Sequence, residues 1–247
     1  MSKGFVLVTG AGRRVGAVIA QRLAQDGWRV GVHYNSSREG ADKVVAAIQG
    51  AGGSACALGA DLTDQGAIDA MTGELAGRGD WIGLVNSAAS FEYDDVDSFA
   101  FPLAEAQMKL NLIAPVYLAR ALAGAKPAAG FVINIADQKV LNPNPDFLSY
   151  TLSKLGLAGA TATLAMALAP SIRVNCLAPG LMLPSGDQSE ENFARVHDQT
   201  LTGKGATPDD VADAAIYLAN AQSVTGQLIA VDGGQHLVRS ARDVMFT

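Results

Sequence analysis

The sequence predicts an α/β fold: a single domain, residues 1–247, built on a seven-stranded parallel sheet that is doubly wound, with helices on both faces. Two observations predict it. Short apolar runs alternate with longer Ala-rich stretches of helical period, which is the pattern of strands joined by right-handed helical crossovers. The 247 residues are 49% hydrophobic, which is enough to bury one substantial core. No internal repeat or low-complexity linker divides the chain.

The apolar runs place the strands, and the stretches between them place the helices. We expect strands at residues 5–9, 29–34, 54–59, 81–85, 131–136, 172–177 and 227–231. A first helix runs to about Asp26, a long Ala-rich helix covers about 148–169, and a last helix starts near Pro208. The longest polar, irregular stretch is 185–200, inside a segment of about 181–207 that is either a lid over a substrate site or a solvated loop.

Composition and charge exclude several classes of function. The net charge of −6 and the isoelectric point near 5.0 argue against nucleic acid as a partner, although Arg13, Arg14 and Arg38 could hold one phosphate group. Cys56 and Cys176 lie in apolar segments without metal-ligand spacing, so we expect buried free thiols, no metal site and a cytoplasmic protein. The longest uncharged helical stretch, 155–169, is too short to span a bilayer, so no membrane segment is expected.

The turn after the first strand is rich in glycine. It reads Thr9-Gly10-Ala11-Gly12-Arg13-Arg14-Val15-Gly16 and joins a buried strand to a helix. Glycines let the backbone approach a pyrophosphate at a helix N-terminus, where free N–H groups and the helix dipole favour anions. An ordinary tight turn is the alternative, but the first strand-to-helix junction is where a dinucleotide would bind.

The end of the second strand indicates which dinucleotide. An NAD enzyme usually places an acidic residue there to accept from the ribose 2′-OH. This chain has no acid at that point and offers possible hydrogen-bond donors instead, in the run His33-Tyr34-Asn35-Ser36-Ser37-Arg38. With Arg13 and Arg14 they suit a 2′-phosphate, so NADP(H) is the expected cofactor; a solvated polar loop is the alternative.

Two further strand ends carry candidate cofactor contacts. Asp61-Leu62 after the third strand could contact the adenine, or Asp61 could be the N-cap of the next helix. Asn86-Ser87-Ala88 after the fourth strand could line the cofactor ribose, or Asn86 could be a turn residue.

Acid chemistry is suggested by three residues. Tyr150 and Lys154 are four residues apart on one helix face, so the ammonium is expected to lower the phenol pKa from about 10 and make it a usable proton donor. Asp137 ends an apolar strand and could orient the donor, supply a proton itself if its pKa is raised, or cap a loop. A core Tyr with an exposed Lys is the non-catalytic alternative.

These elements, in this order, resemble the classical short-chain dehydrogenase/reductase family, with its Rossmann fold, across nearly the whole chain. The matching features are the Gly-rich turn, Asp61, the Asn86 segment, Asn111 before Ala114-Pro115, Tyr150-x-x-x-Lys154, Pro179-Gly180 and Val231-Asp232-Gly233-Gly234. Three departures are similar to the pteridine reductase branch, which includes bacterial dihydromonapterin reductases: Arg14 replaces the family's middle glycine, Ser87 replaces a second Asn, and Asp137 replaces the usual catalytic Ser.

The resemblance implies reduction of a pterin C=N by NADPH, with a dihydropteridine, dihydromonapterin or dihydrofolate as substrate. It assigns Asn111 to a water that links Lys154 to solvent, although a plain mid-helix Asn is the alternative. It adds Val15, Pro179 and Gly180 to the cofactor contacts and places the pterin between Phe91 and the nicotinamide. The implied substrate contacts are Arg14, Ser90, Phe91, Asp137, Tyr150, Leu183 and Arg239.

The resemblance also implies a homotetramer in which Arg239 reaches a neighbouring subunit's active site, unless the C-terminus is simply frayed. Two other functions remain open. One is a carbonyl or 3-oxoacyl thioester reductase, against which an ionised Asp137 argues because it would repel the developing oxyanion. The other is a non-catalytic NADP-binding regulator, against which the presence of both Tyr150 and Lys154 argues.

Overall fold

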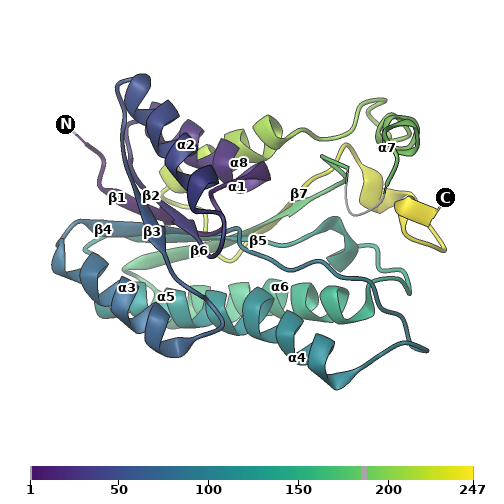
Figure 1. The fold of residues 1–247 in the computed structure, drawn as a ribbon, viewed down its shortest axis with the longest axis horizontal. Helices are drawn as coiled ribbons and strands as arrows, with labels where there is room; N and C mark the ends of the chain where they lie inside the picture. The colour runs from purple at the N-terminus through teal and green to yellow at the C-terminus, as the bar shows by residue number, and fades with distance from the viewer. Residues whose placement is uncertain (1, 185–187, 247) are drawn as a thin grey trace.

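A seven-stranded parallel sheet forms the centre of the protein, as the sequence predicts. The computed structural model describes residues 2–184 and 188–246. In these residues the strand order is β3-β2-β1-β4-β5-β6-β7 (Figure 1). The strands are β1 (Phe5–Val8), β2 (Arg29–Tyr34), β3 (Ser54–Gly59), β4 (Trp81–Asn86), β5 (Gly130–Ile135), β6 (Ile172–Pro179) and β7 (Leu228–Val231).

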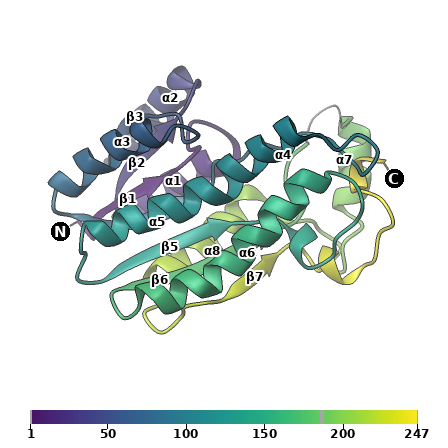
Figure 2. The same cartoon turned by 90° about the horizontal axis from the view of Figure 1, so that it is seen from below.

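Helices cover both faces of this sheet (Figures 1 and 2). One face carries α1 (Arg14–Gln25), α2 (Arg38–Gly50) and α8 (Pro208–Asn220). The other carries α3 (Gln65–Gly77), α4 (Phe101–Met108), α5 (Ala114–Gly124) and α6 (Leu148–Leu168). A π-helical turn, Lys109–Ile113, joins α4 to α5, and short 3-10 turns cover Gln138–Val140, Gln235–Leu237 and Val244–Phe246.

Alternation along β1 shows why the sheet is covered twice. Val6 and Val8 belong to the apolar cluster under α1, α2 and α8, whereas Phe5 and Leu7 belong to the cluster on the opposite face. Successive side chains of a strand point to opposite faces, so a strand that is apolar throughout needs a layer on each side. All four residues are buried, which fixes β1 in the middle of the sheet.

The order of the strands also positions the functional site. From β1 the chain adds β2 and β3 on one side and then β4, β5, β6 and β7 on the other. Ligands of open α/β sheets bind at such a reversal, outside the carboxyl ends of the strands. The Gly-rich turn, Asn86 and Asp137 all follow or end strands at this edge.

The polar stretch 185–200, expected to be irregular, contains the helix α7 (Glu190–His197). Ser189 caps it by accepting from the backbone N–H of Asn192, acidic residues occupy its first turn, and Arg195 and His197 lie in its last. These charges complement the helix dipole. A search for apolar periodicity does not register such a charge pattern or a capping residue. Residues 185–187 of this stretch lie outside the described residues.

The two remaining expectations concern the long helix and the cysteines. Helix α6 matches the helix expected at about 148–169 and, by length and composition alone, is long and apolar enough to cross a membrane. In the structure it packs on β6 and carries Tyr150 and Lys154 into the pocket described below. Cys176 is buried, but Cys56 is only half-buried; both are free thiols.

Candidate active site

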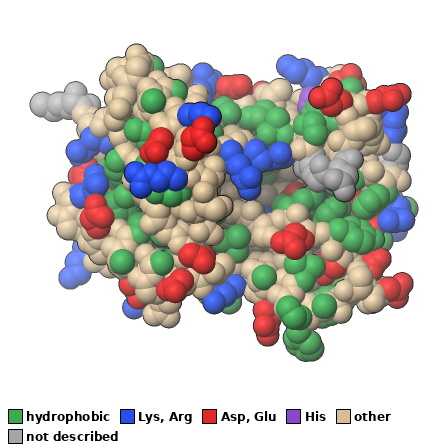
Figure 3. All heavy atoms as spheres, in the orientation of Figure 1, with side chains coloured by type: hydrophobic (Ala, Val, Ile, Leu, Met, Phe, Trp, Pro, Cys, Tyr) green, Lys and Arg blue, Asp and Glu red, His purple; other side chains and the backbone are tan. Residues whose placement is uncertain are grey.

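A cavity of about 760 Å³ lies at the carboxyl edge of the sheet, which is the size of a ligand pocket. Figure 3 shows a hollow on this face of the molecule, with Lys and Arg side chains at its rim. Most of the residues predicted to bind cofactor or substrate line the cavity. The predicted cofactor contacts among them are Gly10, Arg13, Arg14, Val15, Gly16, His33, Tyr34, Asn35, Ser36, Asp61, Leu62, Ser87, Ala88, Pro179 and Gly180. The predicted substrate and catalytic residues among them are Ser90, Phe91, Asp137, Tyr150, Lys154 and Leu183.

The Gly-rich turn brings its backbone close to the N-terminus of α1. A Cβ on Gly16 would stand 2.5 Å from the carbonyl oxygen of Gly10, and Gly10 itself has φ of +63°, so both positions need glycine. Arg14 also has a positive φ, 52°, a conformation that glycine adopts most readily and that fits the glycine implied here by the family resemblance. No side chain caps α1, which leaves N–H groups of its first turn facing the pocket for an anion.

His33 has a different role from the one expected. Its Nδ1 accepts from the N–H of Gly10 at 3.1 Å, and its Nε2 lies 3.0 Å from the carbonyl oxygen of Ala60. Burial lowers the pKa of His33 to about 4, so the ring is neutral and Nε2 donates to Ala60. With both nitrogens engaged, His33 supports the glycine turn and has no donor left for a phosphate.

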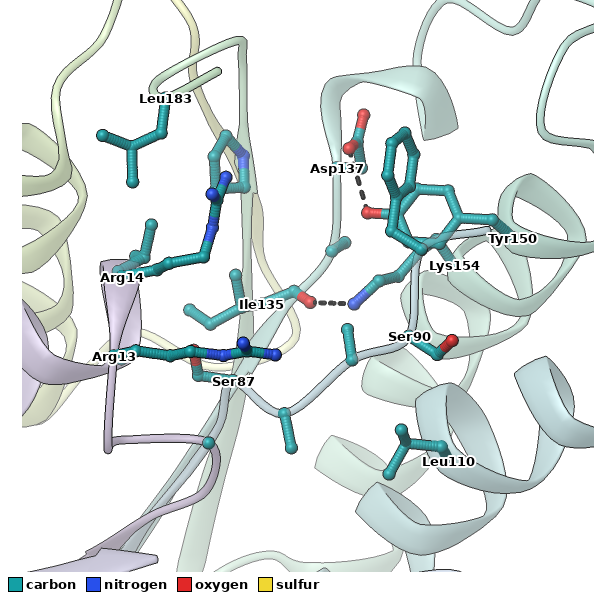
Figure 4. A pocket seen from close by; sticks show the side chains of 18 of the residues that line it. Arg13, Arg14, Ser87, Ser90, Leu110, Ile135, Asp137, Tyr150, Lys154 and Leu183 are labelled. Carbon is teal, nitrogen blue, oxygen red and sulfur yellow. Dashed lines mark hydrogen bonds between the residues drawn. The ribbon is translucent and has the colours of Figure 1, made fainter. Parts of the chain in front are cut away.

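The two arginines of the turn face the pocket, but Arg38 does not. The guanidinium of Arg14 donates twice to the carbonyl oxygen of Pro184, at 3.1 Å each, and so spans the pocket to the segment after β6. Arg13 also lines the pocket, and its side chain points across it in Figure 4. Arg38 is outside the lining, on the exposed side of α2, where it pairs with Asp42.

Asp61 is not the N-cap of the helix that follows β3; its side chain forms a local turn with Thr63. Its Oδ1 accepts from both the backbone N–H and the hydroxyl of Thr63, at 2.8 Å each, and these bonds lower the pKa of Asp61. The N-cap of α3 is Asp64, which accepts from Ala67. Asp61 therefore stays ionised at the edge of the pocket.

Of the predicted contacts Asn86, Ser87 and Ala88 at the end of β4, only Ser87 and Ala88 line the cavity. The backbone N–H groups of Ser87 and Ala88 both donate to the hydroxyl of Thr9, which ties this segment to β1. Asn86 is buried, does not line the cavity, and donates to the side-chain oxygen of Asn134 at 2.8 Å. It braces β4 against β5, so the expectation of a ribose contact from Asn86 is corrected.

Asn111 is likewise an internal anchor. It lies in the π-helical turn, is fully buried, and does not line the cavity. Its side chain accepts from the N–H of Ser90 at 2.9 Å and donates to the Ser90 carbonyl at 3.0 Å and to Ser153 at 3.1 Å. These contacts fix the segment that carries Ser90 and Phe91. The water that would link Asn111 to Lys154 stays a prediction.

Asp137, Tyr150 and Lys154 meet between β5 and α6 (Figure 4). The hydroxyl of Tyr150 donates to Oδ2 of Asp137 at 3.0 Å, while Oδ1 accepts from the backbone N–H of Lys139 at 2.8 Å. Asp137 therefore caps the 3-10 turn and contacts the phenol with the same carboxylate. Lys154 lies one helical turn from Tyr150, and its ammonium donates to the carbonyl oxygen of Ile135 at 2.7 Å.

Burial dominates the titration of this group. It raises the pKa of Asp137, and together with the carboxylate of Asp137 it raises the pKa of Tyr150 well above 10. Lys154 was expected to lower the phenol pKa, but its ammonium is turned to Ile135 and burial lowers its own pKa to about 8. The phenol of Tyr150 is thus held protonated, and Asp137 is the acid whose pKa is shifted toward neutral pH.

The substrate end of the pocket is aromatic. Phe91 stacks on Phe147 with ring centroids 4.1 Å apart and meets Tyr150 edge to face at 4.7 Å. Phe147 has a positive φ of 56° where α6 begins. Phe91 therefore packs on its own chain and also lines the cavity, and its contact with a pterin stays a prediction.

The C-terminal segment reaches the same end of the pocket. Asp243, Val244 and Met245 line the cavity, and so does the buried Lys139. Arg239, predicted to contact substrate, is exposed and lies outside the cavity of its own chain. The lining residues Asp243, Val244 and Met245 were not predicted, because a non-periodic terminus gives no local signal in the sequence. The position of Lys139, two residues after Asp137, was a usable signal.

Comparisons with known proteins extend over almost the whole chain. A family model described as enoyl-(acyl carrier protein) reductase matches residues 10–236. The structure of FolM alternative dihydrofolate reductase 1 from Brucella suis, in complex with NADP, shares 39% identity with a TM-score of 0.90 over 98% of each chain.

Two curated relatives show how broad the similarity is. An uncharacterized oxidoreductase of Methylorubrum extorquens is 33% identical, over 92% of this chain and 96% of the relative. The 3-oxoacyl-[acyl-carrier-protein] reductase FabG of Staphylococcus aureus is 31% identical, over 94% and 97%. Similarity alone therefore includes reductases with different substrates.

Proposed function

The chain belongs to the short-chain dehydrogenase/reductase family, and we propose that within it the protein is an NADPH-dependent reductase of pterins, with hydride delivered to a ring C=N. The observation that carries the proposal is the carboxylate of Asp137 bonded to the hydroxyl of Tyr150 at 3.0 Å. The similarity to FolM alternative dihydrofolate reductase 1, whose structure was solved with NADP, supports the proposal.

The residues present fit this cofactor. The uncapped N-terminus of α1 and the close approach of Gly10 to Gly16 suit a pyrophosphate. The pocket rim from Tyr34 to Ser37 offers an amide and hydroxyls and no carboxylate, which suits a 2′-phosphate. When bound, NADPH supplies the hydride.

Asp137 and Tyr150 form a two-step proton path. In the ionised state of Asp137 the phenol donates to it. Once Asp137 takes a proton, which its raised pKa favours, its own O–H can donate to the Tyr150 oxygen and free the phenolic hydrogen for the substrate. As the phenol then gives its proton to the ring nitrogen beside the reduced carbon, Asp137 replaces it and returns to the carboxylate.

Lys154 acts as a binding and orienting group in this scheme. Its hydrogen bond to the carbonyl oxygen of Ile135 fixes the position of the ammonium. The remaining N–H donors of the ammonium can bind the hydroxyls of a nicotinamide ribose. Its ammonium lies 5.7 Å from the centre of the Tyr150 ring, close enough to attract the ring electrostatically.

A carbonyl or 3-oxoacyl thioester reductase is the second candidate, favoured by the similarity to the Staphylococcus aureus enzyme. An ionised Asp137 would repel the oxyanion that forms on a carbonyl substrate. The cytoplasmic location and the homotetramer, with Arg239 of one subunit near another's substrate, remain predictions.

A side-by-side assay tests the proposal. NADPH oxidation is measured with dihydromonapterin, dihydrobiopterin, dihydrofolate and an acetoacetyl thioester at equal enzyme concentration. We expect a pterin to give the highest kcat/KM. A higher kcat/KM for the thioester than for every pterin would contradict the proposal and favour the second candidate.

A further inference from the structure

The last residues of the chain are fastened along the substrate end of the pocket. We call residues 242–246 the tail. Asp243, Val244 and Met245 of the tail line the cavity that Asp137 and Tyr150 also line. The tail is therefore part of the site of its own chain.

The buried side chain of Lys139 binds the tail. Lys139 is 2% exposed, and its ammonium donates to Oδ2 of Asp243 and to the side-chain oxygen of Asn144, at 2.7 Å each. It also lies 5.4 Å from the centre of the Phe147 ring. A buried ammonium is tolerated only when it is paired and hydrogen-bonded, and here its charged partner is supplied by the tail.

A second attachment lies beside the first. Asp146 is buried and accepts from the guanidinium of Arg242 and from the backbone N–H of Asp243, the latter at 2.6 Å. The ring of Phe246 stacks on Phe147, with centroids 6.1 Å apart. An ion pair, a backbone hydrogen bond and a ring contact thus hold the tail at residues 242, 243 and 246.

Lys139 connects this attachment to the reacting groups. Its backbone N–H donates to Oδ1 of Asp137, while its side chain reaches Asp243. One residue thus fixes the carboxylate that meets Tyr150 and the segment that bounds the same space. None of the steps of proton transfer described above uses Lys139.

We propose that Lys139 is a positioning residue that fastens the tail of its own subunit, and that Asp243 and Met245 form the far wall of the substrate pocket. The wall limits how far a substrate extends beyond Asp137 and holds its ring against the aromatic side of the pocket. The identity of the substrate rests on the proposed function; the attachment of the tail does not.

Four variants separate these roles. Lys139→Met removes the ammonium, and Lys139→Arg keeps a cation as the conservative rescue. Asp243→Asn removes the charge of the tail but keeps an oxygen that accepts from Lys139, so the hydrogen bond can remain while the ion pair is lost. Lys43→Met, on the exposed face of α2 where Lys43 pairs with Glu39, is the matched control.

Hydrogen exchange of the tail tests the attachment without any substrate. Lys139→Met and Asp243→Asn should speed exchange of residues 242–246 by about tenfold or more, whereas Lys139→Arg and Lys43→Met should leave it near the wild-type rate. Unchanged exchange in folded Lys139→Met, or in Asp243→Asn if the first does not fold, would overturn the attachment.

Steady-state kinetics test the wall. The same two variants should raise KM for the dihydropterin by about tenfold while the Kd for NADPH changes less than about twofold. An unchanged KM with faster tail exchange would overturn the wall. If no pterin is turned over, the proposed function fails, and KM is measured with whichever substrate of the panel reacts.

Mixed oligomers decide whether the wall belongs to the same subunit. In hybrids of Tyr150→Phe with Asp243→Asn subunits, the Asp243→Asn subunits retain the intact phenol. A KM equal to that of Asp243→Asn alone supports a wall from the same chain. A return to the wild-type KM shows that a neighbour supplies it and contradicts the proposal.

Discussion

The phenol of Tyr150 donates to Asp137, and the ammonium of Lys154 is turned away to the carbonyl of Ile135. These two hydrogen bonds assign control of the phenolic proton to Asp137 and leave cofactor binding to Lys154, whereas a Tyr-Lys pair is usually expected to perform both functions together. The carboxylate controls the proton on the phenol, while the ammonium is free to bind. The predictions below follow from that division.

Tyr150→Phe should lower kcat for pterin reduction by a factor of about 10² to 10⁴, which is the usual contribution of a positioned proton donor. The ring is kept, so its contact with Phe91 and the fold should persist. NADPH titration should give a wild-type Kd, because Lys154 bonds to Ile135 without the hydroxyl. A wild-type kcat would show that Asp137 protonates the substrate without the phenol.

Asn35→Asp should reverse the preference for NADPH over NADH. Asn35 lines the pocket after β2, and a carboxylate there would repel a 2′-phosphate while accepting from a ribose 2′-OH. The ratio of kcat/KM for the two cofactors is the measurement. Gln49→Glu, which adds the same charge on the exposed side of α2, is the control and should leave the ratio unchanged. Equal use of both cofactors by the wild type would contradict the cofactor assignment.

The activity should fall on the alkaline side as Lys154 loses its proton. Burial lowers the pKa of Lys154 to about 8, so the ammonium is present below that pH and is lost as the pH rises through it. A profile of kcat/KM for NADPH against pH should therefore decline above about 8. Lys154→Arg keeps its charge and should remove this decline, whatever its effect on the maximum rate. A decline that persists in Lys154→Arg would assign it to another group.

Acid should destabilise the fold through His33. Its pKa is 6.5 in the unfolded chain and about 4 in the folded one, so the unfolded state binds the proton first as the pH falls. The stability that the neutral, buried His33 contributes is fully present above pH 6.5 and is lost progressively toward pH 4. At about 1.4 kcal/mol per pKa unit it amounts to roughly 3 kcal/mol.

Denaturant unfolding from pH 7 to pH 4 measures this effect. His33→Asn cannot be protonated, so its free energy of unfolding should fall less steeply over the same range. Equal slopes in the two proteins would show that His33 is not the group responsible.

The sequence predicted the architecture because periodicity and glycine placement are local properties. Each of the seven strands was found within about two residues of its observed limits, since buried parallel strands are apolar throughout. The helix α7 was missed because it is short and mostly polar, so that its clearest signals are a cap and a charge pattern.

The site was predictable as a set of positions but not as a set of contacts. His33 and Asn86 were assigned to ligands because they are polar and lie at strand ends, and the family resemblance assigned Asn111 to a bound water. In the structure their side chains bond to Gly10, Asn134 and Ser90 of the chain itself. Whether a polar side chain near a pocket faces ligand or protein depends on tertiary partners far away in the sequence.

The tail shows the same limit over a longer distance. Lys139 and Asp243 are separated by 104 residues, and neither belongs to a periodic pattern. Only the folded chain brings the two together.

The most direct test of the account is the kcat/KM of Asp137→Ser with a dihydropterin and with an acetoacetyl thioester, each relative to the wild type. Serine restores the neutral hydroxyl that carbonyl reductases use, and it removes the acid that passes a proton through Tyr150. The account predicts that kcat/KM for the pterin falls by a factor of about 10² or more while that for the thioester holds or rises. An Asp137→Ser protein that reduces the pterin at the wild-type rate would contradict it.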